Sequence, residues 1–179
     1  MRYKAYKYRI YPNREQQELI NKHIGCCRYV YNLCLEKKIN AYKTSKKSIP
    51  SFELIKLLPS LKKESETSFL KEVNSLSLQA TIRNLDSAYQ RFFKEKKGFP
   101  KFKSKRDVRQ SFQIVQNTIV DFDKKKVYIP KFKDGIKCRF HRFFDGNIKT
   151  STISRTSTGR YYISILVEFE EDNPKKKAH

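Results

Sequence analysis

The chain has 179 residues, and 40 Lys and Arg against 18 Asp and Glu give it a formal net charge of +22. A hydrophobic fraction of 38% with 13% aromatic residues supplies enough apolar surface for a packed core, which excludes a disordered basic tail. A compact chain with this charge excess repels itself, and a polyanionic partner that releases counterions on binding is the usual reason for it. Nucleic acid is therefore the predicted partner.

A membrane is not an expected partner. No apolar run approaches the roughly 20 residues needed to cross a bilayer, and the N-terminus has no signal-peptide core. We therefore predict a cytoplasmic protein. Its four cysteines lack the spacing of a secreted disulfide framework and are predicted to be reduced thiols.

The first predicted element is a strand with one basic face. Residues 3–11 alternate, so that Lys7 and Arg9 lie on the side opposite the apolar residues. Asn13 followed by Gln16 is typical of a helix N-cap with its reciprocal partner, and apolar residues then recur at helical spacing. Gly25 leaves open whether one helix or two fill this stretch.

Two further helices are predicted before residue 96. A short one starts at Pro50-Ser51, with Pro59 limiting or kinking it. The clearest helix spans residues 75–94, with one apolar stripe and with Gln79 and Arg83 off that stripe. Phe92 and Phe93 fit the stripe and are predicted to belong to the core.

The character changes at residues 96–100, where Gly and Pro end the helix and the period becomes two. Short strands separated by turn residues are predicted at 111–116, 118–122, 127–129, 136–140, 149–155 and 161–169. The lone strand at 3–11 must pair with them to satisfy its backbone. The prediction is an α+β fold, a small closed or half-closed antiparallel β-barrel, similar to the oligonucleotide-binding type, with an inserted helical bundle.

This organisation predicts five segments. They are the first barrel strand at 1–12, the inserted helical lobe at 13–95, a basic connector at 96–110, the rest of the barrel at 111–170, and a linker-like tail at 171–179.

The connector and the helix end before it interleave cations with aromatic residues. Cations neutralise phosphates, and aromatic faces accept stacked bases. The charge density exceeds what solubility needs, so backbone contact is predicted for Lys97, Lys101, Lys103, Lys105 and Arg106.

No catalytic or metal pattern stands out. His23, Cys27 and Cys34 lie on one helical face, but zinc normally takes four ligands at recognised spacings, so packing is the better interpretation. The acidic residues are scattered, and neither a P-loop nor a nucleophile-and-base pattern is present. On these residues the chain is predicted to be a binder with no cofactor, and not an enzyme by itself.

Several stretches resemble the TnpB (OrfB) family of insertion-sequence proteins, in order and over essentially the whole chain. The stretches that carry the resemblance are YKYRIYPN at 6–13, GCCRYVYN at 25–32, FLKEV at 69–73, LDSAYQRFF at 85–93 and GFPKFKSK at 98–105. The family comprises transposon-encoded RNA-guided DNA nucleases, often described as transposases with an N-terminal helix-turn-helix.

The resemblance implies a wedge-like barrel and a helical recognition lobe that hold a guide RNA and double-stranded target DNA. Gln79 resembles the family's glutamine that reads a short motif flanking the target, and Phe52 and Asn117 fall near two further contacts. Ser75 and Leu76 depart from the basic and aromatic pair of some relatives, so a different motif is expected.

The family continues past a linker into a RuvC-like nuclease, and this sequence is expected to lack that catalytic region. Three functional hypotheses remain open. The chain is the binding portion of a TnpB-type protein whose nuclease half is its partner, a piece of an intact nuclease, or a stand-alone basic DNA- or RNA-binding regulator from a truncated insertion element.

Overall fold

The structure is a computed structural model that describes residues 1–170, so the predicted tail at 171–179 lies outside the described residues. Seven strands form one antiparallel sheet in the order β2-β6-β7-β1-β5-β4-β3. The strands are β1 (Arg2–Tyr11), β2 (Gln110–Ile114), β3 (Ile119–Asp121), β4 (Lys126–Tyr128), β5 (Ile136–Arg139), β6 (Asn147–Arg155) and β7 (Tyr161–Phe169).

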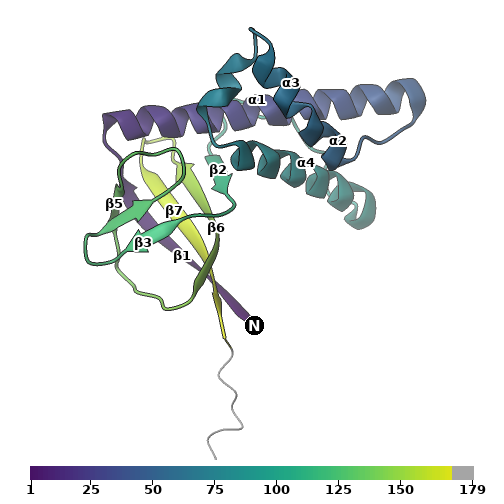
Figure 1. Cartoon of the computed structure of the whole chain (residues 1–179). Helices are drawn as coiled ribbons and strands as arrows, with labels where there is room; N and C mark the ends of the chain where they lie inside the picture. The colour runs from purple at the N-terminus through teal and green to yellow at the C-terminus, as the bar shows by residue number, and fades with distance from the viewer. Residues whose placement is uncertain (171–179) are drawn as a thin grey trace, which may run out of the picture.

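The sheet curves into a half-barrel, and β2 and β3 at its two ends are not paired with each other within the described residues (Figure 1). Strand β1 lies between β7 and β5, which confirms that the first strand pairs with strands from the second half of the chain. The seven predicted strands are all present, and their ends differ by at most two residues from the predictions.

The helices lie between β1 and β2 in the chain, which confirms the α+β class and the insertion into the sheet. This helical lobe consists of α1 (Arg14–Ser45), α2 (Ser51–Lys56), α3 (Leu58–Lys63), the 3-10 helix η1 (Ser68–Glu72) and α4 (Ser75–Glu95). Helix α1 crosses one end of the sheet and continues well beyond it (Figure 1), where α4 and the 3-10 helix pack against it, α2 packs against α4, and α3 packs against α2 and the 3-10 helix.

A capping box starts α1, as predicted. The Asn13 side chain accepts a hydrogen bond from the Gln16 amide at 2.9 Å, and the Asn13 amide donates to Gln16 Oε1 at 3.0 Å. Gln16 Nε2 also donates to the carbonyl of Gly135 at 3.2 Å. The same residue therefore caps the helix and ties its first turn to the sheet.

The alternative of two helices divided at Gly25 is wrong, because α1 is a single helix of 32 residues. The helical cost of one glycine is about 1 kcal/mol. Apolar residues continue on the buried face on both sides of it, among them Ile20, Ile24, Cys27 and Val30, and their burial outweighs that cost. The short helix predicted to start at Pro50-Ser51 is instead divided in two. Its first part, α2, ends at Lys56, and Pro59 lies in the first turn of the second part, α3.

Candidate nucleic-acid interface

The outward side of the sheet is polar and basic. In β1, Tyr6, Tyr8 and Ile10 point into the core, so the intervening Lys7 and Arg9 point outward. The strand pairing places side chains from four other strands beside them. This surface, called the sheet face below, consists of Lys7, Arg9, Ser111, Arg139, Thr152, Ser154, Tyr162 and Ser164.

Strand register fixes the neighbours on the sheet face. Arg9 is paired with Tyr162 on one side and with Arg139 on the other, and Lys7 is paired with Ser164. The Lys7 ammonium lies 4.9 Å from the centroid of the Tyr162 ring, a cation–π contact. The Tyr162 ring is thus held among cations on a surface of otherwise short side chains.

Two hollows meet at Lys7 and Tyr162. One has a volume of about 520 Å³ and includes Arg9, Arg139 and His141, and the other has a volume of about 550 Å³ and reaches towards β2 and β6. The Arg9 Nε atom is buried, and within residues 1–170 it has no hydrogen-bond partner. Cations for phosphates, hydroxyl groups and an aromatic ring therefore converge on one accessible surface.

Lys7 and Arg9 were predicted from the sequence, whereas Arg139 and Tyr162 were missed. A signal was available, because the period-2 alternation at 136–139 and 161–169 places both side chains opposite buried residues. Their convergence on Lys7 and Arg9 depends on the strand order.

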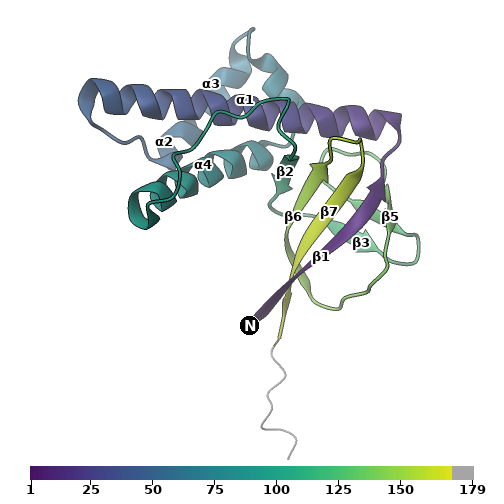
Figure 2. The same ribbon diagram turned by 180° about the vertical axis from the view of Figure 1, so that it is seen from behind.

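The connector crosses α1 on its way from α4 to β2 (Figure 2). It has no regular secondary structure between Lys96 and Arg109, but its backbone is attached to α1. The Asn32 side chain accepts from the Lys103 amide at 2.8 Å and donates to the Lys103 carbonyl at 2.9 Å. This amide clamp holds the middle of the connector as a neighbouring strand would hold it.

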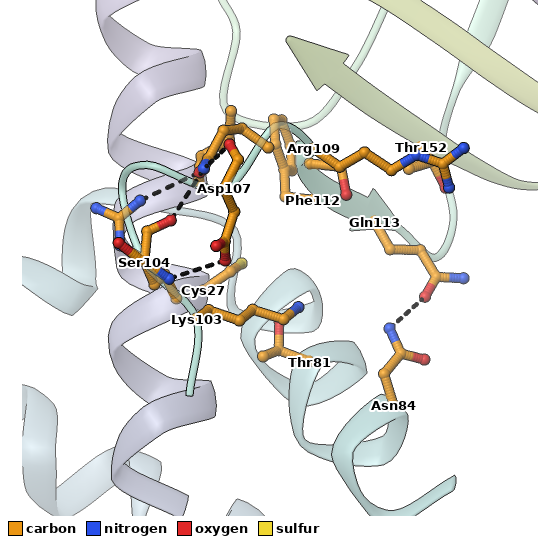
Figure 3. A pocket seen from close by; sticks show the side chains of 14 residues that line it. Cys27, Thr81, Asn84, Lys103, Ser104, Asp107, Arg109, Phe112, Gln113 and Thr152 are labelled. Carbon is orange, nitrogen blue, oxygen red and sulfur yellow. Dashed lines mark hydrogen bonds between the residues drawn. The ribbon is translucent and has the colours of Figure 1, made fainter. Parts of the chain in front are cut away.

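A small pocket of about 130 Å³ lies where the connector meets α1, α4 and the sheet (Figure 3). Gln110 donates from Nε2 to the carbonyls of Ser104 and Asp107 at 3.0 and 2.8 Å, and Arg28 donates to Gln110 Oε1 at 3.3 Å. The Asp107 carboxylate accepts from the Ser104 amide at 2.9 Å. These bonds fold the end of the connector into a compact turn.

The predicted cations of the connector fall into two groups. Lys97, Lys101, Lys105 and Arg106 are exposed. Of these four, only Lys97 forms a salt bridge within the described residues, with Glu95 at 3.7 Å. Lys103 is exposed as well, but its ammonium lies 4.3 Å from the Tyr31 ring centroid, and partial desolvation there lowers its pKa below the usual lysine value. Lys103 therefore both attaches the connector to α1 and contributes positive charge to it.

The candidate motif-reading residues lie at separate places. On α4, Gln79 is half-buried and Arg83 follows it one turn later on the exposed side. Phe52, on α2, is 58% exposed. Asn117 lies in the turn between β2 and β3 with a φ of 67°, a left-handed conformation that asparagine tolerates well. Asn84, next to Arg83, donates to Gln113 of β2 at 3.3 Å and links α4 to the sheet.

The prediction that Phe93 belongs to the core is wrong, because its side chain is 64% exposed and Phe92 is only partly buried. The apolar stripe of α4 continues past the point where other elements cover it. Periodicity alone cannot show where that cover ends.

His23 is packed in the core, with both ring nitrogens used by the backbone. Its Nδ1 lies 2.8 Å from the Leu19 carbonyl, and its Nε2 accepts from the Asn74 amide at 3.1 Å, so the proton is on Nδ1. Burial lowers the pKa of His23. Cys26, Cys27, Cys34 and Cys138 are free and buried, and within residues 1–170 no group of three or more His, Cys, Asp or Glu could hold a metal ion.

None of the helices in residues 1–170 is both long and apolar enough to span a membrane.

Comparison with known proteins gives matches over nearly all of the chain. A family model described as "Helix-turn-helix domain", HTH_OrfB_IS605, matches residues 1–47, which here form β1 and the single helix α1. A protein of Escherichia coli (strain K12) is 31% identical over 97% of the chain, and one of Streptomyces pristinaespiralis is 30% identical over 92%. Both bear the name "Putative RNA-guided DNA endonuclease", with InsQ added for the first.

The chain spans 42% and 41% of the lengths of these two relatives. It is also 37% identical to the virulence protein VsdF of Salmonella dublin, over 57% of the chain and 93% of VsdF. The helix-turn-helix match and the alignments with these relatives agree with the resemblance carried by the motifs, so the chain belongs to the TnpB (OrfB) family of the IS605 type and corresponds to its N-terminal portion.

Proposed function

We propose that this chain is the nucleic-acid-binding N-terminal portion of a TnpB-type RNA-guided DNA endonuclease, holding guide RNA and double-stranded target DNA. The observation that carries the proposal is the connector. Its backbone is clamped by Asn32, while Lys101, Lys105 and Arg106 remain exposed and form no salt bridge within the described residues. A row of cations held in place before binding loses little entropy when phosphates arrive.

The sheet face supplies the second contact surface. Lys7 and Arg9 provide charge beside the Tyr162 ring, and the adjacent hydroxyl groups can bind phosphate or ribose oxygens.

We assign recognition of the flanking motif to α4 and its surroundings. Gln79 carries both a donor and an acceptor, which suits readout of a base edge, and Arg83 lies one turn further along the same side. Phe52 and Asn117 are assigned supporting contacts on the basis of the family resemblance. Binding, rather than cleavage, is the proposed share of this chain, and cleavage is assigned to the part of full-length relatives outside the match.

Purification from the native host followed by sequencing of the bound RNA tests the proposal. We expect enrichment of one transcript from the end of the element, bound more tightly than unrelated duplex at every salt concentration. Recovery of bulk nucleic acid that is lost as salt rises, without enrichment, would contradict guide binding.

The division between charge and motif reading needs a separate test. Gln79→Ala is expected to relax sequence preference, whereas Lys101→Gln should weaken binding to all sequences alike. Gln90→Ala on the exposed side of the same helix serves as the matched control for Gln79. Equal losses across all sequences for Gln79→Ala and Lys101→Gln would refute the assignment.

A second candidate function is a stand-alone DNA- or RNA-binding protein from a truncated insertion element. The similarity to VsdF favours it, since 93% of that separately named protein aligns within this chain. A chain that acts alone should bind specific DNA without RNA, so treatment with ribonuclease before a DNA-binding assay separates the two candidates.

A further inference from the structure

The far end of the helical lobe holds a pocket that the sheet face and the connector cations do not include. It lies between the last turns of α1, the last turns of α4 and the start of the connector, and its volume is about 480 Å³. This pocket is called the aromatic pocket below. Its walls are formed by Tyr42, Tyr89, Phe92, Phe93 and Phe99, and its rim carries Lys43, Lys46 and Lys47.

The aromatic rings are arranged but not covered. Phe99 meets Tyr89 and Phe92 edge to face, with centroids 5.3 and 5.2 Å apart, which fixes the relative orientation of the three rings. Phe93 is 64% exposed and Tyr42 is 52% exposed. Clustered exposed aromatic residues around a hollow are typical of a binding site.

The positive charges around the pocket indicate that its ligand is anionic. Lys43, Lys46 and Lys47 form no salt bridge within residues 1–170, and Lys46 lies over the Tyr42 ring at 5.1 Å. The C-terminal ends of α1 and α4 both point this way (Figure 1), and lysines in a last turn commonly offset the negative end of a helix. Three rim lysines around an apolar hollow exceed that need and favour an anionic partner with a planar, apolar part.

One buried lysine gives the pocket a fixed polar wall. Lys38 is 3% exposed, and its ammonium donates to the Ile49 carbonyl at 2.7 Å and to Asp86 at 3.3 Å. It also lies 4.9 Å from the Tyr89 ring centroid. These contacts join α1 to α4 and to the segment before α2, so the pocket is preformed.

We propose that the aromatic pocket takes one unstacked nucleobase of a single-stranded RNA segment, while the rim lysines bind the adjoining phosphates. The base would stack on Phe93 or Tyr42, the two most exposed rings of the pocket. The connector begins at Lys96, beside the pocket, so a strand that follows its cations arrives at the rim. This inference rests on the proposed nucleic-acid function and adds a base-binding site to it.

The test measures binding of a fluorescent oligouridine and of an abasic oligomer of equal length to the whole chain. Phe93→Ala is expected to weaken oligouridine binding about tenfold without changing the salt slope, and to leave abasic binding unchanged. Phe93→Trp should restore affinity, because tryptophan offers a larger stacking face. Phe143→Ala, which removes a ring that is 70% exposed on the loop before β6, is the matched control and should have no effect.

Equal affinity of Phe93→Ala and the unaltered chain for oligouridine would overturn the inference, as would the same loss with the abasic oligomer. Binding of phosphatidylglycerol vesicles that depends on Phe93 while RNA binding does not would also overturn it. If Lys101→Gln still weakens RNA binding in any of these cases, the proposed function stands without the pocket. If the unaltered chain binds neither oligomer, the proposed function fails first.

Discussion

His23 shows how a single buried residue links stability to pH. Burial lowers the pKa of His23 in the folded state below its ordinary value of 6.5. As the pH falls below 6.5, His23 therefore binds a proton in the unfolded chain before it does so in the folded chain. Protonation would also remove the acceptor for the Asn74 amide. Stability is therefore full above about pH 6.5 and falls as the pH drops towards the folded-state pKa.

Urea unfolding at a series of pH values between 7.5 and 5 measures this fall. We expect His23→Leu to flatten the pH dependence in that window, even though it lowers stability overall by leaving the Asn74 amide without a partner. His141→Gln, at an exposed position, should retain the fall. An unchanged pH dependence in His23→Leu would contradict the assignment.

At the scale of the element, Gly25 lies inside α1 without a steric reason for being glycine. A Cβ atom there would lie 3.7 Å from an Arg28 side-chain nitrogen, an ordinary van der Waals contact. Gly25→Ala is expected to raise the free energy of unfolding by about 0.5–1 kcal/mol, measured by chemical denaturation. Gly159→Ala should instead destabilise, because Gly159 has a φ of 82°. A loss of stability in Gly25→Ala would mean that the added methyl group does not fit at this point of α1.

The connector is an element held by side chains rather than by a ladder of backbone hydrogen bonds. Asn32→Ala removes both bonds to Lys103, at an expected cost of about 1–2 kcal/mol, and frees the neighbouring cations to move. Hydrogen exchange at residues 101–106 should accelerate, and RNA affinity should fall although no charge is lost. Asn40→Ala, on an exposed part of the same helix, should change neither, and unaltered exchange in Asn32→Ala would contradict the clamp.

The sequence predicts those structural features that depend on residues close together in the chain. The alternation in β1, the capping box at Asn13 and the period-3.6 stripe of α4 are local patterns, and each element they predict is present. The contact between Asn32 and Lys103 joins residues 71 positions apart, and the meeting of Tyr162 with Lys7 requires knowledge of the strand order. The exposure of Phe93 likewise depends on which elements cover the end of α4.

At the scale of the whole molecule, the sheet face and the connector should contribute to binding independently. Lys7→Gln and Lys101→Gln are each expected to reduce the slope of log affinity against log salt by about 0.7–0.9, and the double variant by the sum. Salt titrations with one RNA measure all three slopes. Lys22→Gln is the control, because Lys22 is already paired with Glu72 at 3.0 Å. A double variant no different from either single variant would mean that the two lysines do not contact phosphates at the same time.

The uninterrupted course of α1 has a consequence for what the molecule can measure. A helix of 32 residues at 1.5 Å per residue is about 48 Å long, and it runs from the sheet to the aromatic pocket. Because α1 has no hinge at Gly25, it holds the sheet and the aromatic pocket at a fixed separation. That separation equals the rise of about 14 base pairs of duplex at 3.4 Å each. A nucleic acid that binds both the sheet face and the aromatic pocket, as proposed, would therefore have to span a distance fixed by the length of one helix.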